Sequence, residues 1–133
     1  MSLRDLVDTN VLSELVKRRP NAGVLAWAEQ VRVLALSPVV IEEIHYGLSW
    51  RPNQRISKWF ENFLAQHCQI LPITQQIAEE AGQLRGRLKA KGQSRSQADM
   101  LLAATALEHG LVLVSRNTRD FGGCGISLLN PFS

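Results

Sequence analysis

Short apolar runs alternate with longer amphipathic segments along this chain of 133 residues. Such runs are typical of strands buried within a parallel sheet, and we expect strands at residues 6–7, 33–36, 69–73, 111–114 and 126–129. Apolar positions three and four residues apart predict helices between the strands, at residues 11–16, 24–30, 39–48, 56–64, 75–91 and 98–109. This alternation predicts an α/β fold, a three-layer α/β/α sandwich around a short parallel sheet.

Capping residues mark the ends of several of these helices. Asn10 precedes the first helical segment and is a reasonable N-cap, while Ser37, followed by proline, and Thr74 begin later helices. Gly92 and Gly110 follow the last periodic positions of two helices, where glycine commonly ends a helix. The caps therefore agree with the helices that the periodicity predicts.

The composition is that of an ordinary globular domain. Hydrophobic residues make up 45% and charged residues 20% of the chain, so residues 1–133 are expected to form a single folded domain. No apolar run approaches the roughly 18 residues of a membrane span, and the N-terminus lacks the basic flank and apolar core of a signal peptide. We therefore expect a cytoplasmic protein that does not enter membranes, with Cys68 and Cys124 as unpaired thiols.

Positive charge is concentrated in two places, although the formal net charge is only +3. One cluster lies at the end of the long helix and in the loop after it, and consists of Arg85, Arg87, Lys89, Lys91 and Arg95. The second cluster consists of Arg116 and Arg119. Such groups can neutralise the phosphates of a polyanion. For the first cluster, a solvated helix face is the alternative explanation.

Three aspartates lie where an apolar element begins or ends. Asp8 follows the first strand, Asp99 opens an apolar helix, and Asp120 lies in the loop after a late strand. Because the carboxyl ends of parallel strands meet at one edge of a sheet, Asp8 and Asp120 should be close together. Asp99 and one acid of the pair Glu42 and Glu43 could join them. Carboxylates that converge repel one another, and a bound divalent cation removes that cost.

Each acid also has an ordinary structural explanation. Asp8 can cap the helix that follows it, and Ser96 with Asp99 fits a capping box. Asp120 is a common type of loop residue, and Glu43 can lie on a solvated helix face. Taken one at a time, these residues leave a structural role and a metal-binding role open.

The acids belong to four short segments that follow one another along the chain, at residues 8–14 (DTNVLSE), 41–47 (IEEIHYG), 99–106 (DMLLAATA) and 115–121 (SRNTRDF). In this order they resemble the four motifs of PIN-domain proteins, and within that superfamily the VapC and FitB toxins of bacterial toxin–antitoxin pairs. The resemblance spans nearly the whole chain. The family's glutamate lies four residues before a glycine, here Gly47, so the resemblance selects Glu43 rather than Glu42.

The resemblance implies an endoribonuclease that depends on Mg²⁺ or Mn²⁺, with Asp8 and Asp99 as direct metal ligands. Glu43 and Asp120 would hold water molecules of the ion or complete a second metal position, and oxygen ligands of this kind suit such hard cations. The residues implied to support the acids are Asn10, Ser115 and Asn117. Those that could hold the RNA backbone are Arg85, Arg87, Arg95, Arg116 and Arg119.

The resemblance also implies a homodimer and a small antitoxin, similar to VapB or FitA, that blocks the site and also binds operator DNA. Four aromatic residues could line the groove for this partner or the dimer contact, namely Trp50, Trp59, Phe60 and Phe63. Packing in the core explains the same helical stripe.

Two other functions stay open at this stage. The protein could act mainly as a subunit of a DNA-bound regulatory complex with its antitoxin, with little cleavage of its own. An aspartate after the first strand could also accept a phosphoryl group, as in receiver domains or aspartyl-phosphate phosphatases. The phosphatase pattern, however, needs a second aspartate where Asn10 stands, and the receiver pattern needs a lysine near Ser115.

Overall fold

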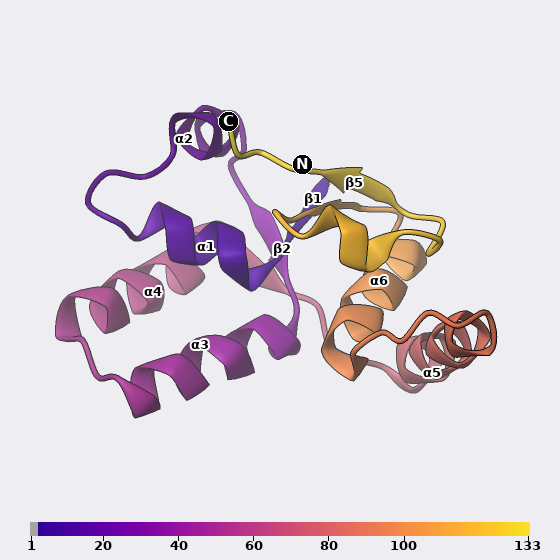
Figure 1. Cartoon of the computed structure of the whole chain (residues 1–133). Coiled ribbons are helices and arrows are strands. Elements are labelled where there is room, and N and C mark those ends of the chain that lie inside the picture. Colours follow the sequence, from indigo (N-terminus) through magenta and orange to yellow (C-terminus); the bar gives the residue numbers. More distant parts are fainter. Residues whose placement is uncertain (1–2) are drawn as a thin grey trace.

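The computed structural model describes residues 3–133 and contains a five-stranded parallel sheet (Figure 1). Its strands are β1 (Asp5–Val7), β2 (Leu34–Leu36), β3 (Cys68–Ile70), β4 (Val112–Val114) and β5 (Ser127–Leu129). Their order in space is β3-β2-β1-β4-β5. The register pairs Leu6 of β1 with Ala35 on one side and with Leu113 on the other. The first strand of the chain is therefore the central strand of the sheet.

Helices cover both faces of the sheet (Figure 1). On one side lie α1 (Thr9–Leu15), α2 (Ala22–Glu29), α3 (Pro38–Trp50) and α4 (Gln54–His67). On the other side lie α5 (Gln75–Ala90) and α6 (Gln97–His109), and a short 3-10 helix, η1 (Thr118–Phe121), connects β4 to β5. The predicted three-layer α/β/α arrangement is confirmed. No helix within residues 3–133 is long and apolar enough to cross a membrane.

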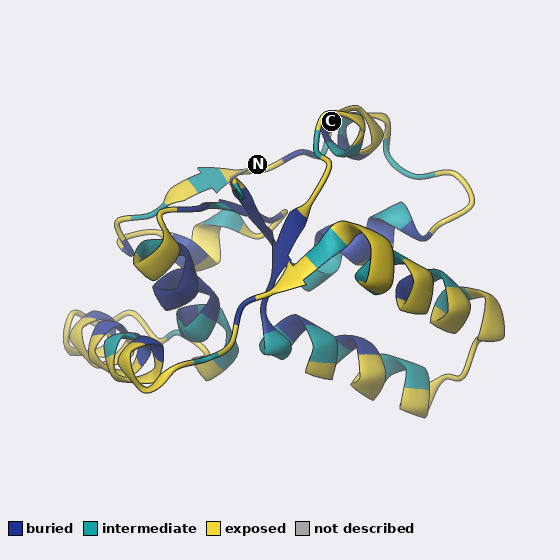
Figure 2. Cartoon of the chain, turned by 180° about the vertical axis from the view of Figure 1, so that it is seen from behind, coloured by how far each residue is buried: buried dark blue, intermediate teal, exposed yellow. Residues whose placement is uncertain are grey.

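The core lies between the sheet and the helix faces turned toward it (Figure 2). All residues of β1 and β2 are buried, whereas the edge strands β3 and β5 are partly exposed. The most enclosed helix is α6, in which Met100 and Ala103 are 0% exposed, as expected of a helix that is apolar nearly all round. Cys68 and Cys124 are both free thiols, as predicted.

The aromatic residues of α3 and α4 have different environments. Phe60 is 5% exposed and belongs to the core, so core packing accounts for this part of the stripe. Trp59 and Phe63 are half-buried and stack on each other with ring centroids 4.7 Å apart. Trp50 is 69% exposed, and the guanidinium of Arg51 lies over its ring at 4.6 Å from the centroid.

Most of the predicted helix ends are confirmed. The hydroxyl of Ser37 accepts the N–H of Val39 at 3.1 Å, and Thr74 caps α5 in the same way. Gly92 and Gly110 follow α5 and α6 with φ of +81° and +63°, a region in which glycine is not strained.

The prediction that Asn10 is the N-cap of the first helix is wrong. The helix begins at Thr9, and Asp8 caps it, with its Oδ1 accepting the N–H of Thr9 at 2.7 Å. Asn10 lies inside the first turn, so its side chain is available for contacts outside the helix. The expected capping role of Asp8 is therefore real, and its other carboxylate oxygen needs a separate explanation.

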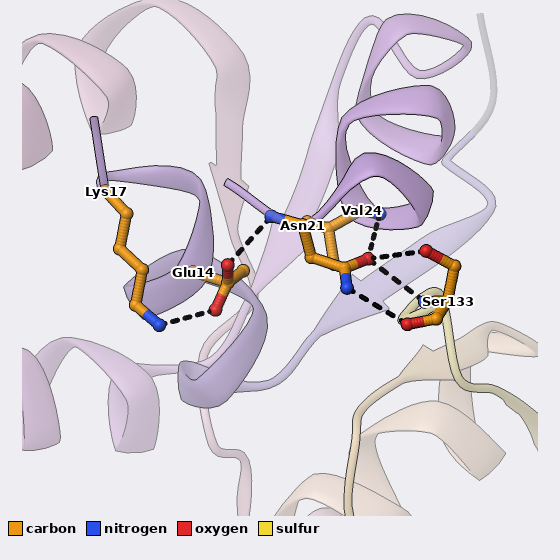
Figure 3. Close-up of polar contacts among 5 residues, drawn as sticks. All are labelled: Glu14, Lys17, Asn21, Val24 and Ser133. Atoms are coloured by element: carbon orange, nitrogen blue, oxygen red, sulfur yellow. Dashed lines mark hydrogen bonds and ion pairs between the residues drawn. The ribbon is translucent and has the colours of Figure 1, made fainter. Parts of the chain in front are cut away.

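A polar cluster at the far end of α1 connects this helix to α2 and to the last residues of the chain (Figure 3). Glu14 is 9% exposed and accepts the Nζ of Lys17 and the N–H of Asn21, each at 2.8 Å. The Lys17 contact holds the pKa of the Glu14 carboxyl below its ordinary value. The side-chain oxygen of Asn21 caps α2 at Val24 and also accepts the N–H of Ser133 at 3.0 Å.

Candidate active site

The direction of strand addition reverses at β1. The chain moves from β1 to β2 and β3, and the crossover through α5 and α6 then sets β4 on the other side of β1. In open α/β sheets, ligands bind at such a switch point, in the crevice beyond the carboxyl ends of the strands. Asp8 and Ser115 directly follow β1 and β4, so both lie at this crevice.

The carboxylate of Asp8 is held by donors from both strand ends. Asp8 is 7% exposed, and its Oδ1 is used by the helix cap. Its Oδ2 accepts the hydroxyl of Ser115 at 2.7 Å and the side-chain amide of Asn10 at 3.3 Å. Capping thus accounts for one oxygen of Asp8, and the other is oriented by residues that the helix does not need.

Asn10 and Ser115 also connect the two strand ends directly. The side-chain oxygen of Asn10 accepts the N–H of Arg116 at 3.0 Å, and its Nδ2 donates to the Ser115 hydroxyl at 3.3 Å. Asn117 takes part through its main chain, because its N–H donates to the same hydroxyl at 3.0 Å. Asn10 and Ser115 therefore contact Asp8 themselves, whereas Asn117 acts on Ser115.

Glu43 is the acid of the α3 pair that lies at the crevice. It is half-buried, and its Oε1 accepts the hydroxyl of Thr9 at 2.5 Å, while Glu42 is exposed. Because Thr9 directly follows Asp8, this bond keeps Glu43 beside Asp8. Thr9 was not among the residues expected at the site, although its place directly after Asp8 is the signal that could have revealed it.

Asp99 lies in the first turn of α6, whose N-cap Ser96 accepts the N–H of Asp99 at 3.0 Å. Burial raises the pKa of the Asp99 carboxyl, and a hydrogen bond with Ser96 opposes this rise. Negative charges nearby raise the pKa further, and they belong to Asp8, Asp120 and Glu43. The capping bond of Ser96 and the charges of the neighbouring acids therefore both act on Asp99, and its role as a metal ligand stays a prediction.

Asp120 is the most solvent-accessible of these acids. It lies on η1 rather than in an irregular loop, and its residue is exposed. The main-chain oxygen of Asp120 accepts Nη1 of Arg95 at 2.6 Å. The next residue, Phe121, is 1% exposed and packs in the core, so η1 is held at both of these positions.

The arginines that were expected to hold RNA differ in their availability. Arg95 is half-buried, and its guanidinium contacts the main chain of η1. Arg85 also donates to the main chain, at 3.2 Å from the oxygen of Arg95. Arg85 is nevertheless exposed, as are the remaining members of the set, Arg87, Arg116 and Arg119.

The donor set fits a hard divalent cation. Neither of the two ion pairs within residues 3–133 includes one of the four acids of the crevice, so none of these carboxylates is paired with a side-chain cation. All four supply oxygen ligands, which Mg²⁺ and Mn²⁺ prefer. Within the same residues, no three His, Cys, Asp or Glu side chains are grouped so that they could enclose an ion by themselves. An ion here would keep water ligands, as Mg²⁺ usually does.

The PIN domain family matches this chain over residues 6–122, from β1 to the end of η1. The chain belongs to the PIN domain family. It is 33% identical to the VapC ribonuclease Y4jK of Sinorhizobium fredii over 96% of this chain and 96% of that protein. It is 30% identical to the toxin FitB of Neisseria gonorrhoeae over 96% of this chain and 97% of that protein. The resemblance to VapC and FitB seen in the motifs is confirmed.

The fold agrees with a solved structure of the same kind. The structure of DNA-bound VapBC from Salmonella typhimurium matches with a TM-score of 0.85 and 26% identity, over 98% of this chain and 99% of that chain. The similarity therefore extends over nearly the whole of both chains.

Proposed function

We propose that this protein is a metal-dependent endoribonuclease that acts as the toxin of a toxin–antitoxin pair. The observation that carries the proposal is the pair of acids held at the switch point, Asp8 by Ser115 and Asn10 and Glu43 by Thr9. The negative charges of both acids and of Asp120 also raise the pKa of Asp99. Carboxylates this close together repel one another, and a bound divalent cation removes that repulsion. The relatives named VapC ribonuclease and toxin FitB support the same activity.

Asp8 and Asp99 are proposed as the direct ligands of Mg²⁺ or Mn²⁺. Glu43 and Asp120 would hold water molecules of the ion or complete a second metal position. When bound, the ion lowers the pKa of water and stabilises negative charge that grows on the phosphate. Hydrolysis in this way would leave a 5′-phosphate and a 3′-hydroxyl.

The other residues of the crevice would act by holding these acids in place. Ser115 and Asn10 fix one oxygen of Asp8, and Thr9 fixes Glu43. Preorganised ligands need no rearrangement when the ion and the substrate bind. The exposed arginines Arg87, Arg116 and Arg119 are candidates for contacts to RNA phosphates around an otherwise repulsive acidic site.

A small antitoxin is the proposed protein partner. The relatives include the toxin FitB, and the VapBC structure that this fold matches is bound to DNA. We therefore propose an antitoxin similar to VapB or FitA that blocks the crevice and binds operator DNA, a homodimeric toxin, and a cytoplasmic site of action, where RNA is the substrate. Trp50, the exposed last residue of α3, is a candidate contact for this partner.

The test is cleavage of a defined pool of structured RNA by the purified protein without antitoxin, in Mg²⁺ or Mn²⁺ and in EDTA. Asp99→Asn and Glu43→Gln should abolish metal-dependent cleavage. Glu42→Gln is the matched control for Glu43→Gln, because Glu42 is the exposed neighbour on the same helix. The Glu42→Gln protein should cleave RNA at the wild-type rate. An Asp99→Asn protein that cleaves at the wild-type rate would refute the proposal.

The second candidate function is a subunit of a DNA-bound regulatory complex, favoured by the match to DNA-bound VapBC. A protein that binds Mn²⁺ but cleaves no RNA in either metal would support this alternative. The next measurement would then be operator binding by the toxin–antitoxin complex, with and without the Asp99→Asn change.

A further inference from the structure

We propose that Arg95 is a positioning residue that sets the separation of Asp99 and Asp120, an inference that rests on the proposed function. Nη1 of Arg95 donates to the main-chain oxygen of Asp120 at 2.6 Å. Arg95 also directly precedes Ser96, the N-cap of the helix whose first turn carries Asp99. This side chain therefore connects the beginning of α6 to η1, and with them two acids that lie on different elements.

The backbone of Arg95 is itself held by α5. Nε of Arg85 donates to the main-chain oxygen of Arg95 at 3.2 Å. Just before it, Gly92 turns the chain at φ +81°, and the N–H of Gln93 donates to the oxygen of Leu88 at 2.9 Å. Because α5 packs along α6, the guanidinium of Arg95 reaches η1 from a fixed position.

By contrast, η1 does little to fix Asp120 by itself. It is a 3-10 turn of four residues, and such short helices have poor hydrogen-bond geometry. Asn117, at its N-cap position, makes no side-chain cap bond, and Asp120 is exposed. Phe121 fixes the end of η1 in the core. Arg95 adds a charged hydrogen bond at Asp120, the position where the turn needs support.

One further contact, to Gln93, agrees with an Arg95 side chain that faces the protein. Nη2 of Arg95 lies 3.4 Å from Oε1 of Gln93, and a Cβ added at Gly123 would lie 3.9 Å from the same Oε1. Burial raises the pKa of the Cys124 thiol, Arg95 lowers it, and Asp99 raises it. The turn after η1 is therefore near both Arg95 and Asp99.

The same contacts distinguish Arg95 from a residue that only holds RNA. A side chain that binds phosphates keeps its donors in solvent, whereas Nη1 and Nη2 of Arg95 are both bonded to the protein. Arg87 belongs to the same basic cluster and is exposed on α5. Arg87→Ala therefore removes the same side chain and charge from the cluster without removing the contact to η1, which makes it the matched control.

The test compares Arg95→Ala, Arg95→Lys and Arg87→Ala by Mn²⁺ titration, by RNA cleavage and by hydrogen exchange of the Asp120 amide. Arg95→Ala should weaken Mn²⁺ binding by about 10-fold or more, the effect typical of lost support for a metal ligand. Its kcat should fall while its KM for RNA stays near the wild-type value, and the Asp120 amide should exchange faster. Arg95→Lys, which keeps a cationic donor, should restore most of the Mn²⁺ affinity. Arg87→Ala should change KM alone.

Different results would separate failure of this inference from failure of the proposed function. An Arg95→Ala protein with wild-type Mn²⁺ affinity, wild-type exchange and a raised KM would overturn the positioning role and make Arg95 an RNA contact. If Arg95→Ala does not fold, a fully active Arg95→Lys with faster Asp120 exchange would overturn it as well. A wild-type protein that neither binds Mn²⁺ nor cleaves RNA would refute the proposed function. The exchange rates of the variants would then test only whether Arg95 holds the main chain at Asp120.

Discussion

Ser115 donates its hydroxyl hydrogen to Asp8 at 2.7 Å, across 107 residues of chain. The bond joins the carboxyl ends of the adjacent strands β1 and β4, and Ser115 is 0% exposed. With the N–H of Thr9 on the other oxygen, the Asp8 carboxylate cannot rotate without losing a hydrogen bond. The pairing of β1 with β4 therefore helps to fix the orientation of the Asp8 carboxylate, the candidate metal ligand.

Ser115→Ala should leave Asp8 less well oriented and the N–H of Asn117 without its acceptor. We expect activity or Mn²⁺ affinity to fall by about 10- to 100-fold and the free energy of unfolding to fall by about 1–3 kcal/mol. Ser127→Ala, on the exposed edge strand β5, is the control and should change stability by less than about 0.5 kcal/mol. Wild-type Mn²⁺ affinity in Ser115→Ala would contradict the role of this bond.

Thr9→Val keeps the shape of the side chain and removes the hydroxyl that holds Glu43. Mn²⁺ affinity should fall by about 10-fold, because Glu43 is then free to turn toward solvent. Thr9→Ser restores the hydroxyl and should bind Mn²⁺ nearly as well as the wild type. Equal affinities for the valine and serine variants would show that the hydroxyl is not needed.

Asp99→Asn should make the metal-free protein more stable at neutral pH. The folded-state pKa of Asp99 is raised by burial and by the neighbouring acids, so stability is lost as the pH rises from the ordinary aspartate range through the folded-state pKa. In denaturant unfolding, the free energy of unfolding of the variant should therefore be higher than that of the wild type at about pH 7 and equal to it at about pH 3. A variant less stable than the wild type at neutral pH would contradict this assignment.

In Mn²⁺, the wild type should become more stable than Asp99→Asn. A ligand that binds the folded state at 100 times its Kd adds about 2.7 kcal/mol to the free energy of unfolding. The wild type should gain stability of this size in Mn²⁺, and Asp99→Asn should gain little, as measured by thermal or denaturant unfolding. Equal gains in both proteins would mean that the ion binds elsewhere.

Glu14→Gln should destabilise the protein at neutral pH and have less effect in acid. Lys17 and the N–H of Asn21 lower the folded-state pKa of Glu14, so its contribution is present above the ordinary glutamate pKa and is lost as the pH falls through the folded-state value. Unfolding experiments at about pH 7 and about pH 3 give the comparison. Glu29→Gln, exposed on α2, is the control that should change little at either pH.

The position of Asp8 at the end of β1 could be predicted because it follows from the topology, and its role as a metal ligand stays a prediction. Asp8 directly follows an apolar run, and in a parallel sheet that position faces the crevice. The choice of N-cap for α1 failed because Asp8, Thr9 and Asn10 are all good capping residues, and only the backbone decides which one is last before the helix. Periodicity alone could not tell which of Glu42 and Glu43 faces the protein, and the structure shows that Glu43 is half-buried and Glu42 exposed.

The contacts of Thr9 and Arg95 could not be predicted from their residue types. Thr9 resembles any polar residue at the start of a helix, and its partner Glu43 is 34 residues away. Arg95 resembles a member of a solvated basic cluster until the path of η1 is known, because its acceptor is a main-chain oxygen that any residue at position 120 would offer. Contacts of this kind depend on packing between elements distant in sequence.

The central place of β1 has a consequence for the protein while it is being made. Asp8 leaves the ribosome early, but its neighbour strand β4 and the Ser115 hydroxyl follow 107 residues later. Contacts between such distant parts of a chain form late in folding. A nascent chain thus carries Asp8 without Ser115 or Asp120, and the acidic site is assembled only when most of the domain has been translated. If these acids form the nuclease site proposed above, the nascent chain stays inactive until its own synthesis is nearly complete.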